Sequence, residues 1–241
     1  MTNAAFFDLD NTLISGCALF HLGTGLVTRY GVGWTEITRF GWQHVGYRVR
    51  GERACRVADM RERALSLAAG LPVAEIMQLS EQLYDERLAP RLFEGSRRLL
   101  TEHLDAGDAV WVVTAAPTEL ALLIAGRLGL TGALGTNAEV VDGAWTGRLC
   151  GEVLHGGAKA DAVRTLARSA GLNLHASAAY SDSINDLPLL ESVGLPHAVN
   201  PDRRLRRVAI ERHWPVHEFR KVRRVLRATP LPHPPDAWAV R

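Results

Sequence analysis

The chain has 241 residues, of which 47% are hydrophobic and 22% charged, and a formal net charge of +2. This is the composition of an ordinary globular protein, and the length suits a core domain with a smaller second domain. Three widely spaced cysteines (17, 55 and 150) form neither a disulfide framework nor a metal-binding pattern and favour a reducing compartment. Because no apolar run is long enough to span a membrane and no signal-peptide pattern is present, we expect a cytoplasmic protein that does not enter a membrane.

The first predicted element is a buried strand within residues 4–14. Four apolar residues run into Asp8, and Asp10 follows two places later. Ligands of open α/β sheets bind just beyond the carboxyl ends of the strands, and residues i and i+2 of an extended chain face the same side. Two such carboxylates repel unless a cation neutralises them, and Mg²⁺ commonly takes one or two carboxylates plus phosphate. An isolated Asp-x-Asp pair could also be only a turn.

Residues 15–92 are predicted to be mostly helical and to form an insertion after the first strand. A break at 70–72 stops one helix and starts another, with Pro72 in a first-turn position. An insertion of this size could close over a site and exclude water. The spacing of apolar residues indicates helices at 17–30, 34–49 and 53–69 and a fourth helix after Pro72.

Beyond residue 92 the predicted helices and strands alternate, which favours a parallel sheet with crossover helices. A basic, proline-rich extension follows at 214–241, where four prolines within 230–235 exclude a helix. Before it, we expect helices at 95–106, 117–128 and 159–170, strands at 109–113, 176–180 and 198–199, and a hairpin at 135–149 that turns at Asp142-Gly143.

Positive charge is concentrated in residues 203–227, which hold ten Lys or Arg and two acidic residues. Such a segment can bind nucleic acid or another anionic surface. It lacks the regular interleaving of aromatic residues that a single-strand binding groove requires. We therefore interpret it as a solvated helix face or a clamp on the more acidic body, and we do not expect a nucleic-acid partner.

Polar residues also follow the later strands. Thr114 ends the second core strand, where its hydroxyl and the N–H of Ala115 could cradle a phosphate. Lys159 is one of only two lysines beside 26 arginines, and its compact charge could neutralise a carboxylate and an incoming phosphate. Asp182 and Asp186 can lie close together if their loop enters a helix at once. Each has an ordinary alternative: a capping threonine, an exposed lysine or an Asp-rich turn.

Taken in order, these groups resemble the four motifs of the haloacid dehalogenase-like (HAD) superfamily. The first motif is Asp-Leu-Asp-Asn-Thr at 8–12, and Thr114, Lys159 and the Asp182–Asp186 loop match the other three. The resemblance covers residues 4–213. Within the superfamily, the sequences at 6–10, 142–148 and 180–183 resemble subfamily IB, which includes phosphoserine phosphatase-like enzymes.

The resemblance implies an α/β fold with a Rossmann-like parallel-sheet core and a helical C1 cap. Residues 1–14 and 93–213 would form the core domain, and residues 15–92 would be the cap. It also implies a Mg²⁺-dependent phosphatase that hydrolyses a small phosphorylated metabolite through an aspartyl-phosphate intermediate.

Each motif residue has a role by the same resemblance. Asp8 would be the nucleophile and Asp10 the general acid and base. Asp8, Asp182 and the backbone carbonyl of Asp10 would hold Mg²⁺, while Asp186 would orient Lys159 or a metal-bound water. Thr114 and Lys159 would stabilise charge on the phosphoryl group, and Ala115, Asn185 and Arg63 are candidates for substrate binding.

The sequence departs from phosphoserine phosphatases at the substrate-reading positions. Those enzymes carry a Glu five residues past the motif Thr, where this chain has Cys17, which cannot supply a charge for the substrate ammonium. Arg63, or else Arg61, is a candidate for the substrate carboxylate, although a surface role fits either equally well. We therefore expect that phosphoserine is not the best substrate.

Two other functions remain open from the sequence alone. A phosphotransferase or phosphomutase would use an acceptor hydroxyl in place of water on the same scaffold. A regulatory protein would use the basic segment to bind an anion or nucleic acid and leave the acidic site idle. The sequence gives no evidence on oligomeric state.

Overall fold

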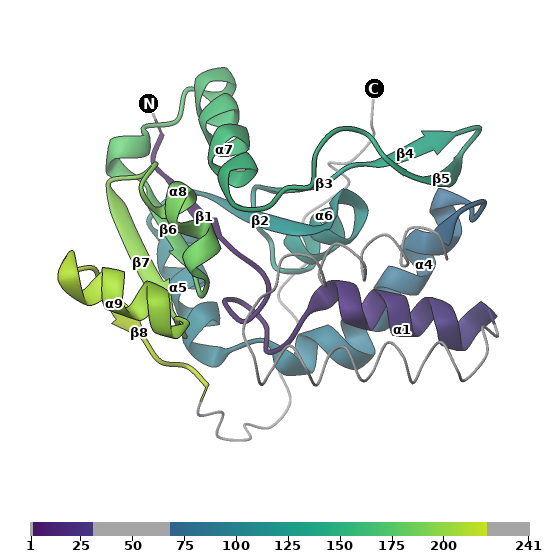
Figure 1. Ribbon diagram of the computed structural model, residues 1–241, viewed down its shortest axis with the longest axis horizontal. Helices are drawn as coiled ribbons and strands as arrows, with labels where there is room; N and C mark the ends of the chain where they lie inside the picture. The colour runs from purple at the N-terminus through teal and green to yellow at the C-terminus, as the bar shows by residue number, and fades with distance from the viewer. Residues whose placement is uncertain (1, 31–67, 221–241) are drawn as a thin grey trace.

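The computed structural model describes residues 2–30 and 68–220. Several predicted features lie outside these ranges. They are the helix at 34–49, the helix at 53–69 except for its last residues, Arg61 and Arg63, and the tail from Lys221 onward. The core is a six-stranded parallel sheet with the order β3-β2-β1-β6-β7-β8 (Figure 1). Its strands are β1 (Ala4–Phe7), β2 (Ala109–Pro117), β3 (Gly132–Thr136), β6 (Ala178–Ser181), β7 (Leu195–Val199) and β8 (Val216–His217).

Helices cover both faces of the sheet, so its central strands are buried on both sides. In β1, Ala4 and Phe6 pack into one hydrophobic cluster, and Ala5 and Phe7 pack into the other. This is why the strand reads as a continuous apolar run rather than an alternating one. The cluster around Phe6 includes α7 (Gly157–Ala170), α8 (Leu187–Leu190) and α9 (Arg203–Glu211), and the cluster around Phe7 includes α1 (Ala18–Tyr30), α4 (Val73–Leu83), α5 (Glu94–Asp105) and α6 (Thr118–Arg127).

The chain reverses its direction across the sheet beside β1. From β1 it proceeds to β2 and β3 on one side, then returns to place β6, β7 and β8 on the other side. In sheets of this kind the crevice outside the carboxyl ends of the strands, at the point of reversal, is where ligands bind. Asp8 follows β1 and Asp182 follows β6, so both acidic loops lie at this point.

Three strands differ from the prediction. β2 continues past Thr114 to Pro117, so Pro117 precedes α6 rather than opening it. Residues 132–136 form β3 at the edge of the sheet, although residues 135–149 were expected to be a hairpin throughout. β8, only two residues long, extends the sheet to His217, beyond the boundary at 213 placed from the sequence. Short edge strands such as β3 and β8 give little hydrophobic pattern, because they hold few residues.

The predicted hairpin turn is confirmed, and the hairpin contacts the inserted helical segment. β4 (Ala138–Val141) and β5 (Ala144–Leu149) are antiparallel, and Asp142 and Gly143 both have positive φ, as a two-residue hairpin turn requires. The Gly70 N–H donates to the Trp145 carbonyl at 2.7 Å, and the Trp145 N–H donates to the Leu71 carbonyl at 2.9 Å. Backbone bonds therefore join the hairpin to the residues that precede α4.

The described parts of the insertion are helical, as expected from the spacing of their apolar residues. α1 and α4 pack at Gly25, where an added Cβ would lie 3.1 Å from the Leu83 side chain. A π-helix (Tyr84–Leu88) and a 3₁₀ helix (Ala89–Arg91) lead back to the core. No helix within residues 2–30 and 68–220 has both the length and the apolar character needed to cross a bilayer.

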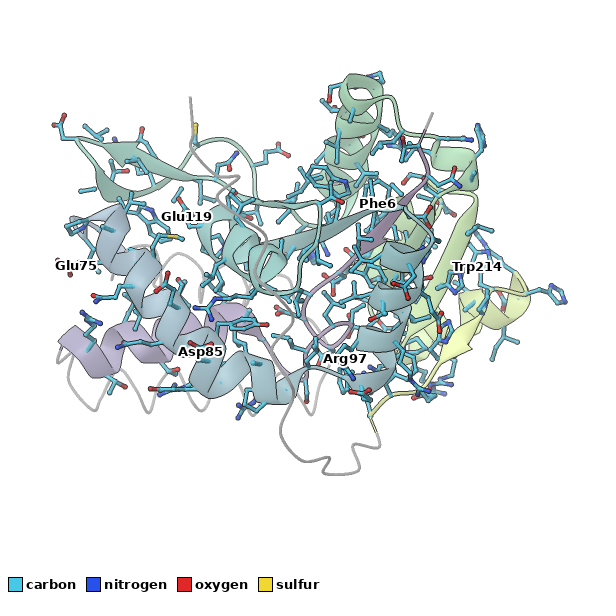
Figure 2. All side chains as sticks on the ribbon, turned by 180° about the vertical axis from the view of Figure 1, so that it is seen from behind. Phe6, Glu75, Asp85, Arg97, Glu119 and Trp214 are labelled. Atoms are coloured by element: carbon cyan, nitrogen blue, oxygen red, sulfur yellow. The ribbon has the colours of Figure 1, made fainter. Side chains whose placement is uncertain are left out.

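Three of the six described arginines of α9 and the segment after it are paired with acidic residues. Arg212 bonds to Glu191 at 2.5 Å and also lies 5.1 Å from the centre of the Trp214 ring, at the outer edge of the molecule (Figure 2). These pairs agree with the interpretation of residues 203–220 as a solvated surface that is partly bonded to acidic residues. The other pairs are Arg207 with Glu211 and Arg206 with Glu218.

Candidate active site

Three neighbouring strands bring the predicted site residues to one edge of the sheet. Phe7 of β1 pairs in register with Val112 of β2 and Tyr180 of β6. The Asp8 N–H continues this ladder by donating to the Tyr180 carbonyl at 2.9 Å. Asp8 therefore lies between the strand that carries Thr114 and the strand that leads into Asp182.

Lys159 joins two of the acidic residues directly. Its Nζ donates to Asp8 Oδ1 at 2.6 Å and to Asp186 Oδ2 at 2.7 Å, and all three side chains are buried. Burial alone would lower the pKa of Lys159, but attraction to Asp186 and Asp8 outweighs it and raises the pKa. The lysine is thus a fixed positive charge under the nucleophile candidate, and the exposed alternative considered for it is wrong.

The carboxylates nevertheless outnumber this cation. Burial raises the pKa of Asp8 to about 7, with Asp186 and Asp10 adding to the effect and Lys159 opposing it. Burial, followed by repulsion from Asp8 and Asp186, raises the pKa of Asp182 well above its ordinary value. Each of these carboxyls is held near others of the same charge, so a further cation would favour their ionised forms.

The donor set at this edge fits a magnesium ion. Asp8 and Asp182 supply two carboxylates, and Asp186 Oδ1 is buried without a hydrogen-bond partner among the described residues. Such an oxygen can accept a bond from a metal-bound water. Within residues 2–30 and 68–220, no three His, Cys, Asp or Glu side chains converge to hold a metal alone. Mg²⁺ does not need such a cage, since it usually keeps waters and takes substrate phosphate as a ligand.

Asp10 bonds to the start of the inserted helices. Its Oδ1 accepts the N–H of Ala18, the first residue of α1, at 2.8 Å. Burial raises the pKa of Asp10, while the bonds from Ala18 and Cys17 act in the opposite direction. Because the side chain is engaged with α1, only the backbone carbonyl of Asp10 is a candidate metal ligand, and the carboxyl is left for proton transfer.

Thr114 and Ala115 lie in an irregular end of β2 rather than after it. The pairing of β2 with β3 shifts register between Val113 and Pro117. Gly135 allows the displaced backbone to pass, since a Cβ there would lie 2.6 Å from the Thr118 Cα. The Thr114 hydroxyl accepts the N–H of Ala116 at 3.1 Å, so that N–H is not free to bind phosphate, while the N–H of Ala115 has no such bond to Thr114.

The loop after β6 holds Asp186 through serine residues that the sequence analysis did not single out. Ser181 Oγ donates to Asp186 Oδ2 at 2.8 Å, and the Ser183 hydroxyl accepts the Asn185 N–H at 3.2 Å. A 3₁₀ helix (Ile184–Asp186) then leads into α8, so Asp182 and Asp186 approach each other as expected. Ser181 could have been found as the hydroxyl residue that ends a buried strand next to an acidic loop.

A layer of stacked rings lies one residue behind the acidic groups. Tyr180 stacks on Phe7 with centroids 4.2 Å apart and on His197 at 4.6 Å. The His197 ring in turn contacts His217 of β8, with 3.1 Å between their nitrogens. Burial, with smaller effects from His217 and His103, lowers the pKa of His197 to about 4. These stacked rings pack next to the start of the loops that carry Asp8 and Asp182.

Arg63 lies outside the described residues. Cys17 is present at the predicted position, and burial together with the nearby Asp10 raises the pKa of its thiol well above the ordinary value. The thiol is therefore neutral.

Comparison with known proteins agrees with these motifs. The haloacid dehalogenase-like hydrolase family matches residues 5–191. A relative named phosphoserine phosphatase SerB1, from Mycobacterium tuberculosis, is 50% identical over 228 residues, which are 94% of this chain and 74% of the relative. A relative from Neisseria meningitidis named histidinol-phosphatase is 29% identical over 91% of this chain and 100% of its own length.

A crystal structure of a protein of unknown function from Bordetella pertussis Tohama I also resembles the chain. It is 30% identical, with a TM-score of 0.78, over 91% of this chain and 100% of that one. The family match spans more than half of the sequence and includes the acidic loops after β1 and β6. The chain belongs to the haloacid dehalogenase-like hydrolase family and is phosphoserine phosphatase-like within it.

Proposed function

We propose that this hydrolase is a Mg²⁺-dependent phosphatase that releases phosphate from a small phosphomonoester through an aspartyl-phosphate on Asp8. The observation that carries the proposal is the buried bond of 2.6 Å between Lys159 Nζ and Asp8 Oδ1 at the carboxyl end of β1. A buried carboxylate held by a lysine at the point of strand reversal is placed to attack a phosphorus atom that other cationic groups hold.

In the first step, a carboxylate oxygen of Asp8 forms a bond to phosphorus as the bond from phosphorus to the ester oxygen breaks. Asp10, whose pKa burial raises, donates its proton to the departing alkoxide. Lys159 and the Thr114 hydroxyl would stabilise the negative charge on the equatorial oxygens. Magnesium, held by Asp8, Asp182 and the carbonyl of Asp10, would supply further charge neutralisation.

In the second step, Asp10 as a carboxylate removes a proton from a water molecule. The resulting hydroxide attacks phosphorus, the bond between phosphorus and Asp8 breaks, and inorganic phosphate leaves. Asp8 is again a carboxylate and Asp10 again an acid, so the cycle consumes one phosphomonoester and one water and releases the alcohol and inorganic phosphate. A second carboxyl two residues from the nucleophile favours this hydrolysis over a stable phosphoenzyme.

The names of the relatives suggest which phosphomonoesters to test first. Phosphoserine and histidinol phosphate share a phosphate on a carbon next to one that bears an ammonium group. A neutral Cys17 thiol beside Asp10 gives that ammonium no charged partner. Because a relative named phosphoserine phosphatase is 50% identical to this chain, our expectation that phosphoserine is not the best substrate needs a direct comparison.

The experiment is phosphate release from a panel that contains phosphoserine, histidinol phosphate and other small phosphomonoesters, with Mg²⁺ or with EDTA. Asp8→Asn keeps the shape of the side chain but removes the nucleophile, and it is expected to abolish turnover. Asp142→Asn is the matched control, because Asp142 lies exposed in the hairpin turn and Asn tolerates its positive φ. Turnover that persists in Asp8→Asn, or in EDTA, would contradict the proposal.

A further inference from the structure

The segment Asn200-Pro201-Asp202, directly after β7, contacts both acidic loops although it carries none of the family motif residues. β7 lies beside β6 and one strand further from β1, so its carboxyl end reaches the same edge of the sheet. Asn200 bonds to the loop after β1, and Asp202 bonds to the loop after β6. We call this segment the β7 clamp.

Asn200 is fully buried, and its polar groups are used on two sides. Its Nδ2 donates to the Asn11 carbonyl at 2.9 Å, next to Asp10, and its Oδ1 accepts the Phe219 N–H at 2.7 Å. The backbone of Asn200 has a positive φ of 47°, a conformation that Asn tolerates better than most residues. Its N–H also donates to the His217 carbonyl of β8. Asn200 is thus fixed by the sheet edge and in turn fixes the Asn11 peptide.

Asp202 makes contacts of two kinds with its two carboxylate oxygens. Oδ1 caps α9 by accepting the N–H groups of Arg204 and Leu205 at 2.7 and 2.8 Å. Oδ2 accepts the Ile184 N–H at 2.9 Å, and the backbone N–H of Asp202 donates to the Asp182 carbonyl at 2.7 Å. The loop between Asp182 and Asp186 is therefore held at Asp182 and at Ile184 by one residue that follows another strand.

We propose that Asn200 and Asp202 are positioning residues that hold the two acidic loops in one relative arrangement, so that Asp8, Asp10 and Asp182 face a common ion and phosphate. The inference rests on the proposed function. Repulsion among the buried carboxyls tends to separate the loops, and the β7 clamp opposes that separation with hydrogen bonds to the backbone of both loops. Residues that orient metal ligands commonly change metal affinity or activity by about 10-fold to 100-fold when they are replaced.

The test uses Asp202→Ser in the full chain. Ser caps a helix about as well as Asp, but it has one side-chain oxygen and cannot also accept the Ile184 N–H. Binding of Mg²⁺ alone is measured by calorimetry, kcat and KM are measured on the best panel substrate, and stability is measured by thermal unfolding. Arg207→Ala is the control, because it removes an exposed ion pair from the same helix without touching the loop.

We expect Asp202→Ser to weaken Mg²⁺ binding about 10-fold and to raise the Mg²⁺ concentration for half-maximal turnover equally, with little change in Tm. Wild-type Mg²⁺ affinity in this variant would overturn the proposed role of Asp202. A loss of Tm without loss of Mg²⁺ affinity would assign Asp202 to helix capping alone. If the wild-type chain neither bound Mg²⁺ nor released phosphate, the proposed function would fail first and this inference with it.

Asn200 is tested separately, because it acts on the other loop. Asn200→Asp keeps the acceptor for Phe219 but sets an oxygen against the Asn11 carbonyl. Asn200→Gly keeps the positive φ and removes the bond without adding charge. Both variants are expected to lower kcat about 10-fold while KM changes little, because the loop carries the nucleophile and the acid. Unchanged kcat in a folded Asn200→Gly protein would overturn its positioning role.

Discussion

Replacing Lys159 with Met should destabilise the protein by an amount that increases with pH. The substitution keeps an unbranched side chain but leaves Asp8 and Asp186 without the bonds of 2.6 and 2.7 Å that Lys159 donates to them. Removal of one partner from a buried ion pair typically costs about 3–5 kcal/mol, because the remaining charge stays desolvated. We expect a loss in this range at neutral pH, measured by urea unfolding in EDTA.

The pH dependence follows from the pKa of Asp8, which burial raises to about 7 in the wild type. A carboxyl whose folded pKa is raised binds a proton that the unfolded chain does not, so stability falls as pH rises toward the folded pKa. In the wild type this fall ends near pH 7. Without Lys159 the pKa of Asp8 is higher still, so the variant continues to lose stability above pH 7.

The difference in unfolding free energy between wild type and variant should therefore increase above pH 7 by about 1.4 kcal/mol per pH unit. Unfolding at pH 6.5 and at pH 8.5 measures the effect. Arg164→Met is the matched control on the same helix, since its exposed ion pair with Asp161 should contribute under about 1 kcal/mol at either pH. An equal loss for Lys159→Met at the two pH values would refute the electrostatic argument.

Three further predictions concern single side chains. Asp10→Asn should lower kcat by about 10²- to 10⁴-fold, because proton transfer is lost. The circular dichroism spectrum should not change, because Asn can keep the bond from the Ala18 N–H. A near-normal kcat would exclude Asp10 as the acid. Cys17→Glu should increase kcat/KM for phosphoserine relative to a phosphomonoester without an ammonium group, because it supplies a carboxylate for the ammonium; an unchanged ratio would show that Cys17 does not face the substrate. The contribution of His197 to stability should fall as pH drops from about 6.5 to 4, because burial chiefly lowers the pKa of His197 to about 4 and only the unfolded chain then binds the proton. His197→Phe, which can keep the stacking on Tyr180, should remove this contribution, so the unfolding free energy of the wild type minus that of the variant should fall by about 1–2 kcal/mol between pH 6.5 and pH 4 in urea unfolding, a figure reduced for the partly exposed ring; a constant difference would contradict the prediction.

The sequence could predict those site residues whose type and position directly after a strand are enough to identify them. A buried apolar run identifies β1, and polar residues that follow it must lie at the edge where the other strands end. This reasoning locates Asp8, Asp182 and Asp186 correctly, and the scarcity of lysine correctly favours a buried role for Lys159. The contact between Lys159 and Asp8 spans 151 positions of the sequence, and it was expected only from the compact charge of a rare lysine, which could neutralise a carboxylate.

The parts that were missed depend on backbone irregularity or on distant pairing. The register shift near Thr114 changes which backbone N–H groups are free to bind phosphate. No residue of β2 indicates this shift in the sequence, and the one residue that does, Gly135, lies in β3. β8 is too short to show a pattern, and it forms because β7 offers an open edge. The sequence analysis did not single out Asn200 or Asp202, and only the fold shows which loops they contact.

The position of β1 has a consequence for synthesis of the chain. This strand is made well before its neighbours β2 and β6, and it lies in the middle of the sheet between them. About 170 residues separate Phe7 from Ala178, so a ribosome that adds ~5–20 residues per second leaves one edge of β1 unpaired for roughly 9 to 34 s. An unpaired apolar strand can bind another chain. A nascent chain arrested before residue 178 should therefore depend on chaperones far more than the finished protein does.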